Sequence, residues 1–149
     1  MGRLVAGFFA AVNRGDVKEA MGAFTDKLGW YSVTEGNPRG RGRHFVAYKP
    51  SELRSYLSDR VTQNERMYLV SIDVDYERPG NLGHVAYRIH RTADDLTDYS
   101  PKMGGKGAID CSTGLISVWS MAQGHEPVPG SLCPGEPETP TAALACARR

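Results

Sequence analysis

Two apolar stripes with helical spacing occupy the first 28 residues, and a short polar break separates them. In the first stripe, apolar side chains recur at positions 4, 5, 8, 9 and 12, which places them on one face of a helix. Gly15 suits the position just past a helix end, because glycine adopts the left-handed conformation without a steric penalty. Asp16 can cap a second helix, with Glu19 spaced to complete a capping box. The pattern predicts two helices joined by a corner, with both stripes facing one core.

From residue 29 the hydrophobic period changes to two, which is typical of β-strands. Strands are predicted over residues 29–36, 44–48, 67–77, 83–92, 106–111 and 114–122, and a third helix over residues 51–61 with Ser51 as its cap. Residues 93–105 are predicted to form a loop. Helices segregated from a mostly antiparallel sheet indicate an α+β fold in one domain, residues 1–123. Residues 124–149 are rich in proline and glycine without an apolar period, which predicts a flexible tail.

The two long strands are predicted to form a hairpin whose register decides which side chains are buried. We expect Asp73 to lie opposite Arg88 and Val74 opposite Tyr87, so that the polar residues share the outer face. Asp73 and Asp75 are then interpreted as part of a solvated or dimer-facing charge ladder rather than as a catalytic pair. This register buries Tyr68, Val70, Ile72, Val74, Val85, Tyr87 and Ile89.

Composition excludes several classes of partner and cofactor. Lysine and arginine total 18 against 17 for aspartate and glutamate, so no strong field favours nucleic acid or an anionic membrane surface. No apolar run approaches the roughly 20 residues that a membrane-spanning helix needs. The two histidines of the fourth predicted strand, His84 and His90, lie about 20 Å apart along that strand, too far to share a metal. No metal site or cofactor is therefore expected.

Three cysteines, Cys111, Cys133 and Cys146, are an odd number without C-x-x-C spacing. This pattern gives neither a disulfide framework nor a zinc site, and it suits reduced thiols in a cytoplasmic protein. The sequence leaves open whether Cys133 and Cys146 pair under oxidising conditions.

The order of these elements resembles the nuclear transport factor 2-like superfamily and its SnoaL-like branch. The segments that carry the resemblance are FFAAVNRGDVKEAMGAF at the start of the chain and GKGAIDC and GLISVWSM near the end of the domain. The resemblance spans about residues 3–123, and Gly114, Ile116 and Trp119 match the usual spacing of the closing strand. It implies a cone-shaped fold, in which a curved sheet wraps around the helices, with an apolar pocket and frequent homodimerisation through the sheet. Members include polyketide cyclases, steroid isomerases, dehydratases and accessory domains, so the resemblance selects no single reaction.

Asp110 is the candidate catalytic residue, because it lies between Ile109 and Cys111 with few polar neighbours. An apolar pocket would raise the pKa of its carboxyl group toward neutrality, as a general acid or base needs. The alternative is that Asp110 faces solvent or pairs with Lys106 or an arginine. Candidate ligand-binding aromatics are Trp30, Tyr31, Tyr56, Tyr68, Tyr87 and Trp119. The alternative for these rings is core packing, and strand alternation prevents Trp30 and Tyr31 from both facing inward.

The leading hypothesis is a cytoplasmic, homodimeric, SnoaL-like domain that binds a small apolar or aromatic molecule. Its chemistry would be cofactor-free acid–base catalysis of the isomerase, cyclase or dehydratase type. The alternative is a non-catalytic accessory or dimerisation module, whose pocket is filled by its own aromatic side chains.

Overall fold

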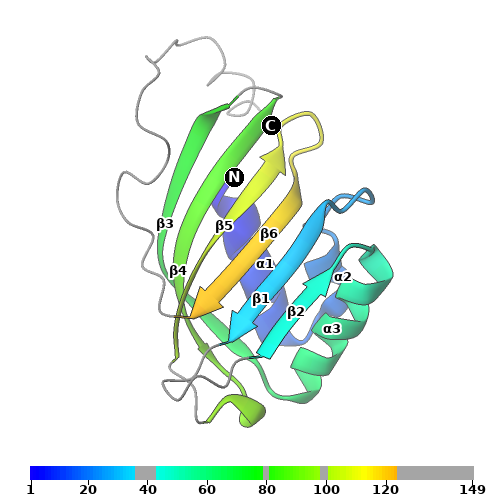
Figure 1. The fold of residues 1–149 in the computed structure, drawn as a ribbon, viewed down its shortest axis with the longest axis vertical. Coiled ribbons are helices and arrows are strands. Elements are labelled where there is room, and N and C mark those ends of the chain that lie inside the picture. The colour runs from blue at the N-terminus through cyan, green and yellow to red at the C-terminus, as the bar shows by residue number, and fades with distance from the viewer. Residues whose placement is uncertain (36–42, 79–80, 98–100, 124–149) are drawn as a thin grey trace.

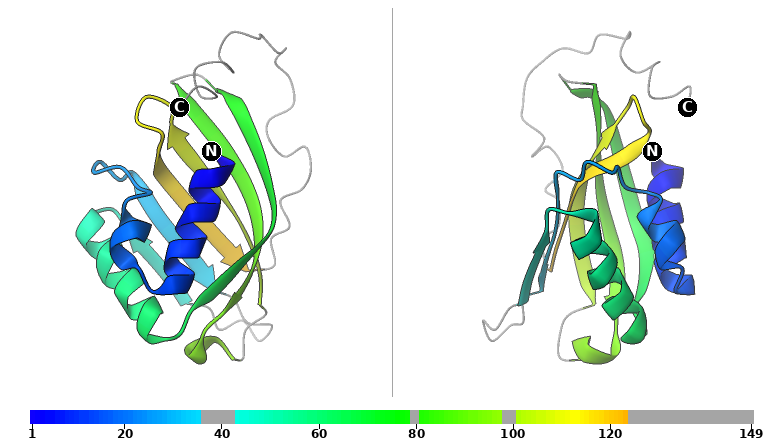
Figure 2. Two further views of the ribbon diagram at one scale, coloured as in Figure 1. Left: turned by 180° about the vertical axis from the view of Figure 1, so that it is seen from behind. Right: turned by 90° about the vertical axis from the view of Figure 1, so that its right-hand side faces the viewer.

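A curved, six-stranded sheet carries three α-helices on one face in the computed structural model, which describes residues 1–35, 43–78, 81–97 and 101–123 (Figures 1 and 2). The helices are α1 (Gly2–Arg14), α2 (Val17–Met21) and α3 (Pro50–Thr62), with a short 3₁₀ helix η1 (Asp94–Leu96). The strands are β1 (Trp30–Glu35), β2 (Arg43–Ala47), β3 (Arg66–Arg78), β4 (Leu82–Thr92), β5 (Lys102–Asp110) and β6 (Leu115–Gln123). The predicted α+β cone is confirmed, whereas the predicted tail lies outside the described residues.

The sheet has the order β2-β1-β6-β5-β4-β3. Strands β3 to β6 form an antiparallel meander, and β1 joins it by pairing parallel with β6. Strand β2 then pairs antiparallel with β1 at the edge of the sheet. Since α3 follows β2 directly, this order brings α3 against the β1–β2 side, as Figure 1 shows.

The corner between α1 and α2 forms as the sequence predicts. Gly15 is left-handed (φ 74°), and the N–H groups of Gly15 and Asp16 donate to the carbonyls of Val12 and Ala11, which closes α1. The Asp16 carboxylate accepts a 2.8 Å hydrogen bond from the Glu19 N–H and so caps α2. The predicted capping box is incomplete, because the Asp16 N–H is already bonded to Ala11 and the Glu19 carboxylate pairs with Arg14 at 2.7 Å.

Helix α3 begins one residue earlier than predicted. Pro50 occupies its first position, where a missing N–H costs nothing, and Lys49 rather than Ser51 is the N-cap. The Glu52 carboxylate accepts hydrogen bonds from the N–H groups of Tyr48 (2.9 Å) and Lys49 (3.2 Å). Ser51 is therefore not the cap, because the proline fixes the helix start ahead of it.

The predicted register of the β3–β4 hairpin was wrong. Ser71 lies opposite Arg88 and Asp73 opposite Ala86, and the register shifts between Leu69 and Ser71. This bulge reverses which side chains face inward along the first part of β3. Met67 is therefore buried, whereas Tyr68 and Val70 are 58% and 61% exposed. The Asn13 side chain holds this part of β3 by donating to the Met67 carbonyl and accepting from its N–H.

Aromatic rings fill the space between α1 and the sheet. Trp119 and Tyr87 stack with ring centroids 4.4 Å apart, and Phe8, Phe9 and Phe24 surround Trp119 at 5.6–6.5 Å. Strand β5 begins at Lys102 rather than at the predicted residue 106. Gly105 lies in this additional part of β5. Because it has no side chain, the Tyr87 ring can pass over it and donate a 2.8 Å hydrogen bond from its hydroxyl to the Ser120 carbonyl.

Cys111 is disulfide-bonded, so the expectation of reduced thiols is wrong at this residue. Disulfides are rare in the cytosol and persist in oxidising environments, and the cysteine argument for a cytoplasmic location therefore no longer holds. The alternative pairing of Cys133 with Cys146 falls outside the described residues. None of the helices in the described ranges has the length and apolar character needed to cross a bilayer.

Candidate functional site

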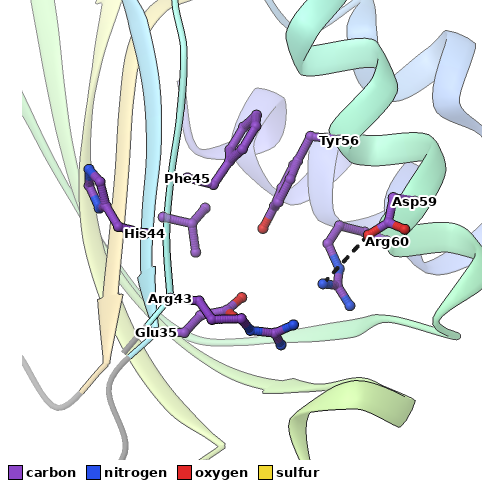
Figure 3. Close-up of a pocket in the computed structure, with 8 residues that line it drawn as sticks. Glu35, Arg43, His44, Phe45, Tyr56, Asp59 and Arg60 are labelled. Atoms are coloured by element: carbon purple, nitrogen blue, oxygen red, sulfur yellow. Dashed lines mark ion pairs between the residues drawn. The ribbon is translucent and has the colours of Figure 1, made fainter. Parts of the chain in front are cut away.

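A cavity of about 220 Å³ lies between α3 and the strands β1 and β2 (Figure 3). Apolar and aromatic side chains form part of its wall, and charged side chains form the rest. Phe45 and Tyr56 face each other with ring centroids 4.1 Å apart and nearly parallel planes. The Tyr56 hydroxyl points from α3 toward Glu35 and Arg60 in Figure 3. The lining residues are Val33, Glu35, Arg43, His44, Phe45, Tyr56, Asp59 and Arg60.

Local periodicity places these residues on the inner face. Along β1, Tyr31, Val33 and Glu35 alternate with outward-facing residues, so the last inward position of this strand is a carboxylate. On α3, Tyr56 and Arg60 are four residues apart and therefore lie on one face of the helix. Arg60 is buried at the end of a helix face whose other buried residues, Leu53 and Leu57, are apolar. The inward face of β1 therefore ends with the Glu35 carboxylate, and the inward face of α3 ends with the Arg60 guanidinium.

Six charged side chains form a closed ring beside the cavity, in which each guanidinium contacts two carboxylates of the ring and each carboxylate contacts two of its guanidiniums. We call this set the charge ring. Because it holds three positive and three negative groups, its net charge is zero. Its members are Arg43, Arg60, Arg91, Glu35, Glu65 and Asp95. Outside the ring, Arg60 also lies 3.8 Å from the exposed Asp59, as the dashed line in Figure 3 marks.

Arg91 is, with Glu65, one of the two most deeply buried members of the charge ring. One of its terminal nitrogens donates to Glu35, and the other donates to Glu65 at 2.8 Å and to the Tyr56 hydroxyl at 2.9 Å. The side chain is 1% exposed, and that of Glu65 is fully buried. Buried charges of this kind persist because each is paired and hydrogen-bonded. Arg91 consequently ties β4 to β1 through Glu35 and to α3 through Tyr56.

The outer half of the charge ring meets at Asp95 in η1. Arg60 donates to both carboxylate oxygens of Asp95, and its Nε lies 2.8 Å from Glu65. Arg43 contacts Asp95 at 2.9 Å and Glu35 at 3.0 Å, which completes the ring. These contacts connect α3, η1 and β2 next to the cavity, whose wall includes Arg43 and Arg60.

Burial and pairing set the protonation states at the site. Burial, more than any neighbouring charge, raises the pKa of the Tyr56 hydroxyl well above its ordinary value, so this group stays protonated. Burial alone would lower the pKa of Arg91, but Tyr56 and Glu65 raise it. Partial burial favours a higher pKa for Asp95, yet hydrogen bonds from Arg60 and Arg43 lower it to about 2. The site therefore combines a protonated phenol with ion pairs that are fixed in their charged forms.

This arrangement favours binding over proton abstraction. The Tyr56 hydroxyl accepts a hydrogen bond from Arg91, so its own hydrogen remains to donate toward a ligand oxygen. The carboxylates of Glu35 and Asp95 are each held by two guanidiniums and are poorly placed to remove a proton. Within the described residues, no group of three or more His, Cys, Asp or Glu side chains is arranged to hold a metal ion.

Asp110 lies away from this cavity, at the turn between β5 and β6. Its carboxylate accepts hydrogen bonds from the N–H (2.8 Å) and hydroxyl (2.6 Å) of Ser112. These bonds lower the pKa of Asp110, the opposite of the raised pKa that an apolar pocket would cause. The expected environment of Asp110 was therefore wrong, because its strand ends there and the side chain stabilises the turn.

The candidate aromatic residues separate into three groups. Trp30 (42% exposed) and Tyr68 (58% exposed) lie on the surface and do not line the cavity. Tyr87 and Trp119 are buried in the stacked core, as the packing alternative expected. Tyr56 lines the cavity, and buried Tyr31 lies next to it with ring centroids 5.7 Å apart.

The charge ring was not predicted from the sequence, although the strand positions of two of its members indicate that they face inward. Glu35 continues the inward alternation of Tyr31 and Val33, and Arg91 continues that of Val85, Tyr87 and Ile89. A glutamate and an arginine at buried positions of two strands require partners of opposite charge. A search for charged residues in phase with an apolar strand face would have found this pair.

Comparison with known proteins identifies the fold and no closer relationship. No model of a protein family matches the sequence, and no curated protein matches it. One similar solved structure is a candidate dehydratase of the NTF2-like family from Streptomyces avermitilis, which is 12% identical over 81% of this chain and 91% of that chain, with a TM-score of 0.60.

Two further solved structures give the same result. An NTF2-like protein of unknown function from Shewanella oneidensis is 15% identical, over 81% of this chain and 94% of that chain, with a TM-score of 0.57. A candidate aromatic ring hydroxylase from Novosphingobium aromaticivorans is 13% identical, over 84% and 87% of the two chains, with a TM-score of 0.57. The chain therefore has the nuclear transport factor 2-like fold, as its sequence pattern predicts.

Proposed function

We propose that this domain binds a small organic molecule in the cavity between α3 and the strands β1 and β2. The ligand would place an aromatic or apolar part against Phe45 and a carbonyl oxygen near the Tyr56 hydroxyl. One observation carries this proposal: Tyr56 lines a cavity of about 220 Å³, and its hydroxyl oxygen accepts a hydrogen bond from Arg91, so the hydroxyl hydrogen is left to donate to a ligand.

The size of the cavity limits the ligand. Pockets for drug-sized ligands typically measure roughly 300–1,000 Å³, so a cavity of about 220 Å³ favours a single-ring compound over a steroid or polycyclic molecule. Any reaction would proceed through polarisation of the carbonyl by the protonated Tyr56 hydroxyl. This is cofactor-free chemistry, as the hypothesis from the sequence expects, but with Tyr56 rather than Asp110 as the residue to test first.

Binding can be tested with acetophenone and ethylbenzene, which have similar shapes and differ in the carbonyl oxygen. Acetophenone at ten times its dissociation constant should stabilise the protein by about 1.4 kcal/mol, a rise in melting temperature of roughly 3–6 °C. Ethylbenzene should bind more weakly, because it gives the Tyr56 hydroxyl no acceptor. The absence of any shift with either compound would remove the support for small-molecule binding.

Tyr56→Phe assigns the binding to this site. Losing one hydrogen bond should weaken acetophenone binding by about three- to tenfold and leave ethylbenzene binding unchanged. The matched control is Tyr48→Phe, because Tyr48 is 65% exposed and does not line the cavity. Equal losses in both variants would place the ligand elsewhere.

A second candidate function, an accessory or dimerisation module, has support from two observations. The interior beside α1 is filled by stacked aromatic rings, and Tyr68 and Val70 are exposed on the edge strand β3. Exposed apolar side chains of this kind are common at protein–protein interfaces. A second copy of this chain is the partner that we propose.

Sedimentation velocity over a range of protein concentrations tests the dimer. We expect a dimer that Tyr68→Ser combined with Val70→Ser dissociates, while Tyr48→Ser leaves it intact. A monomer at every concentration would contradict the dimer without affecting the ligand proposal.

A further inference from the structure

Three buried polar side chains next to the cavity each keep one atom without a hydrogen-bond partner among the described residues. These atoms are Glu65 Oε1, Arg91 Nε and the Tyr31 hydroxyl. Glu65 and Tyr31 are fully buried, and Arg91 is 2% exposed. Unpaired polar atoms are rare in protein interiors because leaving them unpaired is costly, and each one calls for an explanation.

The three groups lie together. Arg91 and Glu65 are joined by a hydrogen bond of 2.8 Å, so their unpaired atoms belong to one contact pair. The Tyr31 ring packs 5.7 Å from the Tyr56 ring, and the Tyr56 hydroxyl bonds the same nitrogen of Arg91 that bonds Glu65. Burial raises the pKa of the Tyr31 hydroxyl most, Tyr56 and Glu65 raise it further, and the nearby Arg91 guanidinium lowers it.

Tyr56 belongs both to the cavity and to this cluster. It lines the cavity together with Glu35 and Arg60, whereas Glu65 and Arg91 do not line it. Its hydroxyl is nevertheless bonded to Arg91. In Figure 3 the Tyr56 side chain extends from α3 into the space above Glu35 and Arg43. The Tyr56 hydroxyl therefore connects the wall of the cavity to the buried pair of Arg91 and Glu65.

We propose that the cavity continues past Tyr56 into a polar subsite formed by Glu65, Arg91 and Tyr31, which takes an uncharged ligand group that both donates and accepts hydrogen bonds. This inference rests on the proposed function and specifies its ligand class. Arg91 Nε supplies a donor, Glu65 Oε1 supplies an acceptor, and the Tyr31 hydroxyl can act as either. A primary amide matches this set, with its carbonyl accepting from Arg91 and its N–H donating to Glu65.

The charge of the site favours a neutral group over an anion. The three guanidiniums of the charge ring are balanced by its three carboxylates, so a second anion gains no net attraction. A carboxylate in the subsite would also lie against Glu65, which has the same charge. A hydrocarbon would leave all three polar atoms unpaired.

Titration of the full chain with benzamide, acetophenone and benzoate, followed by NMR chemical-shift changes, tests the subsite. These probes share one ring and differ in the polar group. Benzamide should bind about tenfold more tightly than acetophenone, which lacks an N–H for Glu65, and benzoate should bind more weakly than either. If acetophenone binds and benzamide is no tighter, the subsite is refuted while the proposed function stands. If no probe binds, the proposed function itself fails.

Tyr31→Phe separates a binding role from a structural one. The variant should weaken benzamide binding by about three- to tenfold, yet its melting temperature should not fall, because it loses only an unpartnered hydroxyl. Tyr48→Phe again serves as the control. Unchanged benzamide affinity in Tyr31→Phe would overturn the proposal. A crystal structure in which an ordered water alone occupies the space between Tyr31, Glu65 and Arg91, with benzamide bound elsewhere, would also overturn it.

Discussion

Replacing Arg91 with methionine tests whether the charge ring is held in the protein interior. Methionine keeps the length and apolar stem of the side chain but removes its charge. Arg91 donates to Glu35, Glu65 and Tyr56, and it is 2% exposed. Removing one partner of a buried ion pair costs about 3–5 kcal/mol, because the other charge is left uncompensated.

The structure places the expected cost of Arg91→Met near the lower end of that range, at about 3 kcal/mol. Glu35 keeps its contact with Arg43, and Glu65 keeps its contact with Arg60, so neither carboxylate loses all its pairing. Domains of this size are stable by about 5–15 kcal/mol, so the variant should fold but lose a large fraction of its stability.

Urea unfolding at pH 7, followed by the fluorescence of buried Trp119, measures this cost. Arg54→Met is the matched control, since Arg54 is exposed on α3, and it should change the free energy of unfolding by less than about 0.5 kcal/mol. Adding Glu65→Gln to Arg91→Met should recover about 1 kcal/mol or more, because an amide is cheaper to bury than an unpaired carboxylate. A cost below about 1 kcal/mol for Arg91→Met would refute a dry, buried ring.

Three further predictions concern stability. Asp95→Asn should lower the free energy of unfolding by about 1–2 kcal/mol at pH 7, after allowance for solvent screening of a group that is 25% exposed. Because the pKa of Asp95 in the folded protein is lowered to about 2, its contribution to stability is complete above about pH 5 and is lost as the pH falls toward 2, so the free energies of urea unfolding of the two proteins should converge there. Gly105→Ala should destabilise the protein by about 3 kcal/mol or more, since a Cβ would collide with the Ser120 carbonyl and the Tyr87 hydroxyl, whereas Gly7→Ala, in an open helical position, should stabilise it by up to about 1 kcal/mol. Equal effects of the two substitutions in thermal unfolding would contradict the crowding argument. Asp16→Ala should cost about 1 kcal/mol through the lost cap of α2, and an unchanged urea midpoint would show that the cap is unimportant.

The sequence predicted elements whose cause is local. The corner at Gly15 and Asp16 follows from glycine's left-handed conformation and from a carboxylate one residue later, and both occur as expected. The alternation of apolar residues located the strands and placed Tyr87 in the interior, and it left open which of Trp30 and Tyr31 faces inward. These features depend on residues within a few positions of one another, so periodicity and capping rules suffice.

The candidate site depended on contacts that no local pattern contains. The bulge between Leu69 and Ser71 turned Tyr68 outward, because an extra residue on one strand reverses the alternation for the residues before it. The cavity and charge ring unite residues of β1, β2, α3, β4 and η1, and those elements meet only when β1 pairs with β6 and α3 covers the β1–β2 side. The sequence carries the inward phase of Glu35 and Arg91 in the alternation of their strands, although that signal did not lead to a predicted site. Only the tertiary structure decided that they meet, because a pair of buried charges is set by the distance between elements far apart in the chain.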